Sequence, residues 1–204
     1  MRITDLSKTE GDFTLQIDRM ELMPGKIHGL VGHNGSGKTI LLKCIMGILT
    51  PDRGTIDYEG LTPQDITLMS QRPYLLHASV YDNLVYPLKV RGQRPDETEM
   101  DRLLERVGLL AQKKQYARSL SSGERQKLSF LRAMVFGPKF VMMDETLSNM
   151  DPGSEAAILD LIRQTQAERP ITWLIVNHQL EQKKELCDVM HRMEKGRYCG
   201  ITEG

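Results

Sequence analysis

The 204-residue sequence has few aromatic residues, no excess of charge of either sign and no long apolar run. Aromatic residues make up 5% of the chain, with a single tryptophan. Lysine plus arginine and aspartate plus glutamate each number 27, so the formal net charge is zero and gives no general attraction to nucleic acid or to an anionic membrane surface. Because a membrane-spanning helix needs roughly 20 apolar residues in succession, we expect any membrane role to depend on a partner.

Cysteine is also scarce. Cys44, Cys187 and Cys199 are odd in number and lack the spacing of metal ligands, which is typical of a protein in the reducing cytoplasm. We expect them to be small core residues and not reactive thiols. With 40% apolar and 26% charged residues, the remaining composition is that of an ordinary globular domain.

The most informative segment is a glycine-rich loop at residues 32–39, which fits the pattern G-x-x-x-x-G-K-[ST]. It follows an apolar run at 27–31, interpreted as a strand, and opens a helical pattern at 39–48. Its glycines let successive backbone N–H groups turn toward a phosphate at the positive end of the helix. The pattern predicts a nucleotide site, with Lys38 on the β- and γ-phosphates and the Thr39 hydroxyl on Mg²⁺. The residues expected to contact the nucleotide are Gly32, His33, Asn34, Gly35, Ser36, Gly37, Lys38, Thr39 and Ile40.

Strand and helix patterns alternate along most of the chain. Further strands are expected at 1–6, 13–17, 55–58, 66–69, 140–143 and 171–176, helices at 123–134 and 154–165, and a hairpin around 194–196. Residues 72 to about 119 lack a buried-strand pattern, and Asp96 and Gly108 are placed to begin and end a helix there. We interpret this region as an inserted helical lobe. The alternation elsewhere predicts an α/β fold with a parallel sheet covered on both faces.

Two acidic residues follow the strand predicted at 140–143. Ligands of open α/β sheets bind beyond the carboxyl ends of the strands, so Asp144 is placed to hold Mg²⁺ and Glu145 to orient or deprotonate an attacking water. The alternative is a plain helix N-cap, but the phosphate loop favours the metal site.

A third segment, residues 120–124, lies 144 − 121 = 23 residues before Asp144 when counted from Ser121. Ser121 and Glu124 have the spacing of a capping box. A serine and exposed N–H groups at a helix N-terminus also form an anion site, and both interpretations can hold together.

These motifs resemble those of ATP-binding-cassette (ABC) transporter ATPase subunits. The segments 32–39, 71, 120–124, 144–145, 148–151 and 178 match in order and spacing over nearly the whole chain. The resemblance implies a P-loop NTPase core with a mostly parallel sheet, an N-terminal antiparallel β portion and an inserted helical lobe. It implies a single ABC ATPase domain over 1–204, with the core and β portion at 1–71 and 130–204 and the lobe at about 72–129.

The resemblance also implies roles for individual residues. Gln71 would contact Mg²⁺ or the attacking water, and His178 would hold the γ-phosphate. The implied catalytic residues are Lys38, Gln71, Glu145 and His178, and the implied metal-binding residues are Thr39, Gln71 and Asp144. Two subunits of this family pack head to tail, and the signature loop of one faces the ATP of the other. The residues implied to meet the opposite subunit are Ser121, Ser122, Gly123, Glu124 and Asp151.

The implied cofactors are ATP and Mg²⁺. The implied partners are an identical or related second ABC subunit, a separate transmembrane permease that keeps the chain at the cytoplasmic face of the membrane and, for an importer, a substrate-binding protein. Residues 71–74 and 86–92 resemble importer-type ATPases, including those for oxyanions such as tungstate. We expect no nucleic-acid partner.

The sequence departs from the family pattern at several positions. Ser122 replaces the first of two signature glycines, Ile40 replaces a hydroxyl residue, and 146–147 are Thr-Leu in place of Pro-Thr. Thr9 occupies the position at which the family has an aromatic residue that stacks on adenine, and Phe13 is the nearest aromatic.

Three other classes share part of the pattern. A GTPase or small-molecule kinase shares the phosphate loop, but the sequence has no Asn-Lys-x-Asp. A non-transport ABC ATPase of DNA repair or translation typically carries coiled coils or nucleic-acid-binding extensions, and the short lobe and zero charge favour a transporter subunit. A regulatory nucleotide-binding protein without turnover is disfavoured by Glu145 and His178.

Overall fold

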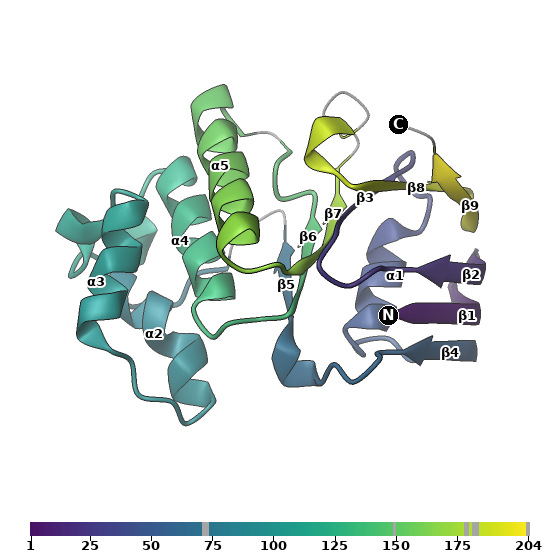
Figure 1. Ribbon diagram of the computed structural model, residues 1–204, viewed down its shortest axis with the longest axis horizontal. Coiled ribbons are helices and arrows are strands. Elements are labelled where there is room, and N and C mark those ends of the chain that lie inside the picture. The colour runs from purple at the N-terminus through teal and green to yellow at the C-terminus, as the bar shows by residue number, and fades with distance from the viewer. Residues whose placement is uncertain (71–73, 149, 178–179, 181–183, 203–204) are drawn as a thin grey trace. The chain divides into compact units, whose positions relative to one another are not determined.

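The computed structural model describes residues 1–70, 74–148, 150–177, 180 and 184–202 (Figure 1). The chain divides into two compact units. The first consists of Met1–Gln71, Lys139–Ser148 and Thr165–Gly204, and the second of Arg72–Pro138 and Asn149–Gln164. The sequence-based domain boundaries, with a lobe at about 72–129, remain a prediction.

One sheet forms the centre of the first unit. In the described part of the chain it has nine strands, in the spatial order β4-β1-β2-β9-β8-β3-β7-β6-β5. The strands are β1 (Arg2–Glu10), β2 (Phe13–Glu21), β3 (Ile27–Val31), β4 (Arg53–Asp57), β5 (Ile66–Ser70), β6 (Phe140–Asp144), β7 (Thr172–Val176), β8 (Val189–Glu194) and β9 (Arg197–Thr202). The neighbouring strands β8, β3, β7, β6 and β5 run parallel to one another. By contrast, β1 pairs antiparallel with β2 and β4, and β8 pairs antiparallel with β9. The predicted α/β fold with a mostly parallel sheet and an antiparallel N-terminal portion is confirmed.

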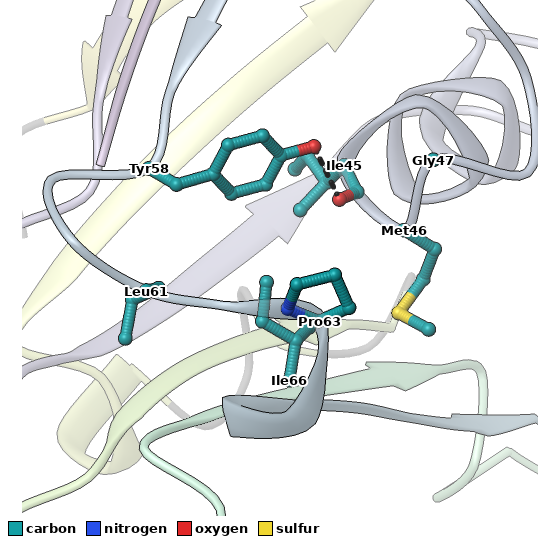
Figure 2. A pocket seen from close by; sticks show the side chains of 7 residues that line it. All are labelled: Ile45, Met46, Gly47, Tyr58, Leu61, Pro63 and Ile66. Carbon is teal, nitrogen blue, oxygen red and sulfur yellow. Dashed lines mark hydrogen bonds between the residues drawn. The ribbon is translucent and has the colours of Figure 1, made fainter.

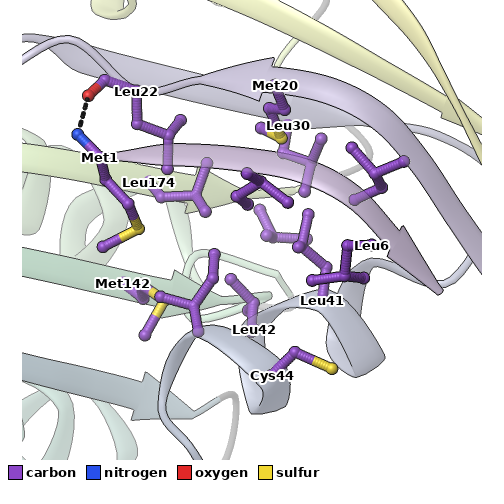
Figure 3. Packing of buried hydrophobic residues seen from close by; sticks show 14 of the residues in the cluster. Met1, Leu6, Met20, Leu22, Leu30, Leu41, Leu42, Cys44, Met142 and Leu174 are labelled. Carbon is purple, nitrogen blue, oxygen red and sulfur yellow. Dashed lines mark hydrogen bonds between the residues drawn. The ribbon is translucent and has the colours of Figure 1, made fainter. Parts of the chain in front are cut away.

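The parallel strands are buried on both faces. All five residues of β3 and of β7 are buried, as expected for strands covered on both sides. Helix α1 (Lys38–Ile45) buries Leu41, Leu42 and Ile45, and these side chains join apolar residues of β1, β2, β3, β6 and β7 in one cluster (Figure 3). Truncating such a leucine to alanine typically costs about 2–5 kcal/mol, so this cluster fixes α1, and with it the loop before it, against the sheet.

The carboxyl end of α1 borders a small apolar pocket (Figure 2). Its volume is about 150 Å³, and Met46, Leu61 and Ile66 are among its lining residues. The Tyr58 hydroxyl donates a hydrogen bond of 2.9 Å to the carbonyl oxygen of Ile45. This bond satisfies one of the carbonyls that the end of a helix leaves without an intrahelical partner.

The second unit is helical. It contains α2 (Val80–Val90), α3 (Glu97–Arg106), α4 (Ser122–Met134) and the part of α5 (Pro152–Glu168) up to Gln164. Helices α2, α3 and α4 pack against one another. The Asp96 carboxylate accepts hydrogen bonds from the N–H groups of Thr98 and Glu99, at 2.8 and 3.3 Å, so α3 begins where the sequence predicted. Among the residues that the structure describes, 3₁₀ turns form at Pro63–Asp65, Leu110–Gln112, Ala117–Ser119 and Lys184–Leu186.

Candidate nucleotide-binding site

The predicted phosphate loop connects β3 to α1. Gly32 lies so close to β8 that a Cβ atom there would be 2.2 Å from the backbone oxygen of Met193. Gly37 precedes α1 with a φ angle of 101°, a left-handed conformation that favours glycine. Gly37 at the N-cap has no side chain to cap this end of α1, and residues 38–41 of its first turn include no acid, which leaves its N–H groups suited to an external anion. The side chains of His33 and Asn34 are exposed.

Lys38 folds back over this loop. Its ammonium group donates hydrogen bonds to the carbonyl oxygens of Gly32 and His33, at 2.7 and 3.1 Å. Burial lowers the pKa of Lys38, while the nearby carboxylates of Glu145 and Asp144 oppose that shift. The positive charge is thus held over the loop by neutral carbonyl groups, which a phosphate can replace as partners.

Thr39 and Asp144 meet at the carboxyl end of the parallel strands. The Thr39 hydroxyl donates to the Asp144 carboxylate, at 3.1 Å to Oδ2 and 3.4 Å to Oδ1. Burial raises the pKa of Asp144, and the neighbouring Glu145 charge adds to the rise, whereas the Thr39 hydrogen bond and the Lys38 charge counter it. A half-buried carboxylate beside a hydroxyl oxygen is a donor set that fits Mg²⁺. The pair predicted from the sequence to hold the metal is therefore in direct contact.

Glu145 has a strained backbone conformation, and both its backbone N–H and its carboxylate are hydrogen-bonded. Its φ angle is 51°, which is uncommon for a residue with a side chain and costs of the order of 1–3 kcal/mol. Its N–H donates to the Val176 carbonyl oxygen of β7 at 2.9 Å, and the Ser148 hydroxyl donates to its carboxylate. The alternative interpretation of Asp144 and Glu145 as a helix N-cap is wrong, because α5 begins only at Pro152.

Residues 120–124, which match the signature loop of the family, lie at the start of α4 in the second unit. The Ser121 hydroxyl accepts a hydrogen bond from the Glu124 N–H at 3.3 Å, and the Glu124 carboxylate accepts one from the Ser121 N–H at 2.8 Å. The predicted capping box is confirmed. Ser122 is exposed in the first turn, whereas Gly123 is half-buried.

Asp151 lies in the same unit and precedes α5. Its Oδ1 accepts a hydrogen bond from the Ser154 N–H at 2.9 Å. A hydrogen bond from the Ser154 side chain is the largest cause of a lowered pKa at Asp151. Sequence reasoning missed Ser154. An aspartate followed by Pro152 and, three residues on, a serine is a helix-start pattern that could have indicated this contact.

The predicted site residues fall into two groups. The first unit brings together residues 32–40 with Asp144 and Glu145, and the second unit brings together residues 121–124 with Asp151. Gln71 and His178 lie outside the described residues. Ile40 packs against the apolar cluster beside α1.

Phe13, the suggested substitute for an adenine-stacking aromatic, lies beside Gly37 of the phosphate loop. A Cβ atom on Gly37 would be 3.1 Å from its ring, and one on Gly196 would be 3.3 Å from it. The half-buried ring therefore packs against the phosphate loop at Gly37. Thr9 is exposed, and its hydroxyl bonds to that of Thr14 at 3.2 Å.

No helix in the ranges that the structure describes is long and apolar enough to cross a membrane.

A family model described as "ABC transporter" matches residues 15–148. The tungstate uptake system ATP-binding protein TupC of Peptoclostridium acidaminophilum is 34% identical over 206 aligned residues, which cover 96% of this chain and 94% of that protein. The methionine import ATP-binding protein MetN 1 of Paraburkholderia xenovorans is 33% identical over 91% of this chain, but the match spans only 58% of that longer protein.

Solved structures give the same result. The cbiO1 protein of Clostridium perfringens, part of the ABC transporter complex cbiONQ, superposes with a TM-score of 0.83 at 26% identity, over 98% of this chain and 86% of its own. The ATP-binding cassette MJ1267 in its ADP conformation has a TM-score of 0.84 at 25% identity, over 100% of this chain and 90% of its own. The phosphate loop, the Thr39–Asp144 contact and similarity along nearly the whole length show that this chain belongs to the ABC transporter family, as one of its ATP-binding, ATP-hydrolysing subunits.

Proposed function

We propose that this chain is the motor of an ABC importer, in which ATP binding closes a pair of such subunits and hydrolysis allows the pair to reopen. The observation that carries the proposal is the meeting of Lys38, Thr39, Asp144 and Glu145 at one end of the parallel strands. This is the edge at which open α/β sheets bind ligands.

In this proposal the phosphate loop binds the β- and γ-phosphates of ATP. Backbone N–H groups of residues 32–39 donate to the phosphate oxygens, and Lys38 exchanges the carbonyls of Gly32 and His33 for them. The Thr39 hydroxyl and the Asp144 carboxylate hold Mg²⁺. Bound there, the metal neutralises charge on the phosphates. ATP occupancy is then favoured because it gives the buried Lys38 an anionic partner.

Glu145 acts on the attacking water. Its carboxylate is oriented by the Ser148 hydroxyl and its backbone by Val176, so the group has little freedom to turn away. A carboxylate held in this way can position the water and accept its proton. Gln71 and His178 complete the site in the proposal, as contacts to the metal or water and to the γ-phosphate, on the strength of the family resemblance alone.

The second group of residues serves the opposite subunit. The start of α4, with Ser121, Ser122, Gly123 and Glu124, faces the γ-phosphate of ATP bound by the partner copy. Asp151 links the two sites. Because each site then needs both subunits, ATP acts as a ligand that shifts an open–closed equilibrium. A separate transmembrane permease converts this motion into transport, and a substrate-binding protein delivers the cargo.

We propose an oxyanion as the cargo class. The relative named for tungstate uptake matches this chain over 94% of its own length, whereas the first methionine-import relative matches over 58%. The cargo would be bound by the permease and the binding protein, so the proposal concerns the complex in which this subunit works.

The test uses Glu145→Gln, which keeps the shape of the side chain and removes its basicity. We expect hydrolysis to fall about a hundredfold or more while ATP binding is retained. Light scattering should show the monomer mass without ATP and twice that mass with it. Glu105→Gln, an exposed position on α3, is the matched control and should hydrolyse ATP as the wild type does. Wild-type turnover by Glu145→Gln would refute the role of Glu145, and a monomer at saturating ATP would refute closure of a homodimer.

A further inference from the structure

The two segments proposed to meet the opposite subunit touch each other through one side chain. Gly123 is packed so tightly against Ser154 that a Cβ atom on Gly123 would lie 2.2 Å from the Ser154 Oγ and 3.3 Å from its Cβ. The same Cβ atom would be 4.0 Å from Oδ2 of Asp151. The beginnings of α4 and α5 are therefore in contact within the second unit.

Ser154 is also bonded to Asp151. Its N–H donates to Oδ1 at 2.9 Å. Its side chain is the largest cause of the lowered pKa of the Asp151 carboxyl group, which places the hydroxyl near that carboxylate. The Ser154 hydroxyl thus lies between the Asp151 carboxylate on one side and the Gly123 backbone on the other.

This arrangement separates the two signature positions. Ser122 is exposed, and its side chain meets no steric limit from its own subunit that the structure describes. A methyl group on Gly123 would force the Ser154 hydroxyl out of its position, because that Cβ atom would lie 2.2 Å from the Ser154 Oγ. A side chain is tolerated at position 122 because that position is exposed, whereas position 123 faces the Ser154 side chain.

We infer that Ser154 is a positioning residue that couples Asp151 to the signature loop, so that one subunit presents both of its contacts to the partner as a single rigid unit. The inference rests on the proposed function, because it needs residues 121–124 and Asp151 to act across a dimer. A displacement of about 1 Å in a group that contacts phosphate can cost roughly a hundredfold in rate. A hydroxyl that fixes the spacing of two such groups would therefore matter without touching ATP.

Three variants in the Glu145→Gln background test this coupling. Ser154→Ala removes the hydroxyl and should weaken ATP-dependent dimerisation about tenfold. Gly123→Ala inserts a methyl group against Ser154 and should weaken it further. Gly123→Ala combined with Ser154→Gly removes the obstructing atom and should restore dimerisation to about the level of Ser154→Ala, which still lacks the coupling hydroxyl. Ser119→Ala is the matched control, since it removes another serine hydroxyl of the same unit, one that donates to the Tyr116 carbonyl oxygen at 2.7 Å.

The readouts distinguish coupling from simple loss of structure. Dimerisation is measured by sedimentation against ATP concentration, and ATP affinity by equilibrium titration at protein concentrations that keep the chain monomeric. We expect Ser154→Ala to bind ATP as the parent does as a monomer and to differ only in dimerisation. In the Glu145-containing protein, the same change should lower kcat with little change in KM.

The outcomes are separable. If the Glu145→Gln parent does not dimerise with ATP, the proposed function fails and this inference fails with it. If the parent dimerises and Ser154→Ala dimerises equally well, only the coupling inference is wrong. It is also wrong if the Gly123→Ala, Ser154→Gly double variant is no better than Gly123→Ala.

Discussion

A chain of buried hydrogen bonds across β3, β8 and β9 makes the stability of the first unit depend on pH. The Nε2 atom of His28 lies 3.1 Å from the Met23 carbonyl oxygen, and its Nδ1 lies 2.9 Å from Nε2 of His191. Nδ1 of His191 lies 2.9 Å from the Tyr198 hydroxyl oxygen. Because a carbonyl only accepts, Nε2 of His28 donates to it. Burial lowers the pKa of both histidines and favours neutral rings, and with both rings neutral His191 donates to His28 and Tyr198 donates to His191.

A further proton on either ring would place a positive charge inside this buried chain, away from water. Burial is the main cause of a lowered pKa at both histidines and brings His191 to about 4. Around His28 the Asp188 carboxylate raises the pKa, and the charges of Lys26 and the Met1 amino group lower it. His28 itself lowers the pKa of His191.

The sign of the pH effect follows from these shifts. The ordinary histidine pKa of 6.5 lies above the folded-state pKa of His191, so the unfolded chain binds the proton first and stability falls as pH falls. The contribution is complete above pH 6.5 and is lost progressively toward pH 4. At about 1.4 kcal/mol for each pH unit, His191 alone should cost about 2 kcal/mol between pH 6.5 and pH 5.

Urea denaturation at pH 7.5 and pH 5 measures this loss. We expect His191→Gln, which cannot titrate, to lower stability at pH 7.5 but to show less than half of the wild-type pH dependence. His77→Gln, at an exposed histidine of the second unit, should keep the full dependence. Equal wild-type stability at the two pH values, or an unchanged dependence in His191→Gln, would show that the histidine chain is not the pH-sensitive element.

Three substitutions test other close contacts. Gly32→Ala places a Cβ atom 2.2 Å from a backbone oxygen of β8, so it should abolish binding of a fluorescent ATP analogue and lower the melting temperature. Gly47→Ala, with no described atom within 4 Å of its Cβ, should retain binding although its left-handed φ of 70° also lowers the melting temperature. Gln166→Leu removes three hydrogen bonds, including one of 2.9 Å from the indole of Trp173, and should lower the unfolding free energy by about 2–4 kcal/mol in urea titrations. Asn83→Ala removes a fully buried amide that bonds four backbone groups of the segment before α2, and should speed limited proteolysis there at least several-fold; unchanged cleavage would contradict this.

The parallel half of the sheet could be predicted because its strands are continuous apolar runs. The antiparallel half was predicted only in part, since β1 extends to Glu10 and β2 to Glu21, beyond the predicted ends at 6 and 17. In β2 buried residues alternate with exposed polar ones. A search for apolar runs therefore stops early in a strand with one face in water. Helix α1 was predicted to reach residue 48 but ends at Ile45, because apolar residues continue past the last helical turn and Gly47 takes a left-handed φ of 70°.

The first-unit site could be predicted because its chemistry is local in sequence. A glycine loop fixes Lys38 and Thr39, and a strand end fixes Asp144. The contact of Ser154 with Gly123 could not be predicted, because it joins two helix starts that are distant in the chain and depends on a missing Cβ atom. The position of Phe13 beside Gly37 of the phosphate loop could not be predicted either, because it results from the packing of β2 against that loop.

The departure at Thr146 shows how a motif can change while its geometry is kept. The resemblance implies a proline at this position, and a proline would fix the turn after Glu145 through its restricted φ angle. Here the Thr146 hydroxyl donates a 3.1 Å hydrogen bond to the Met69 carbonyl oxygen of β5, and the residue is 1% exposed. The turn that holds Glu145 is thus tied to the neighbouring strand by a side-chain bond in place of a ring. Because Glu145 occupies a strained left-handed conformation, it needs such an external restraint, and a hydroxyl with a buried acceptor supplies one that a proline could not, since proline has no side-chain donor.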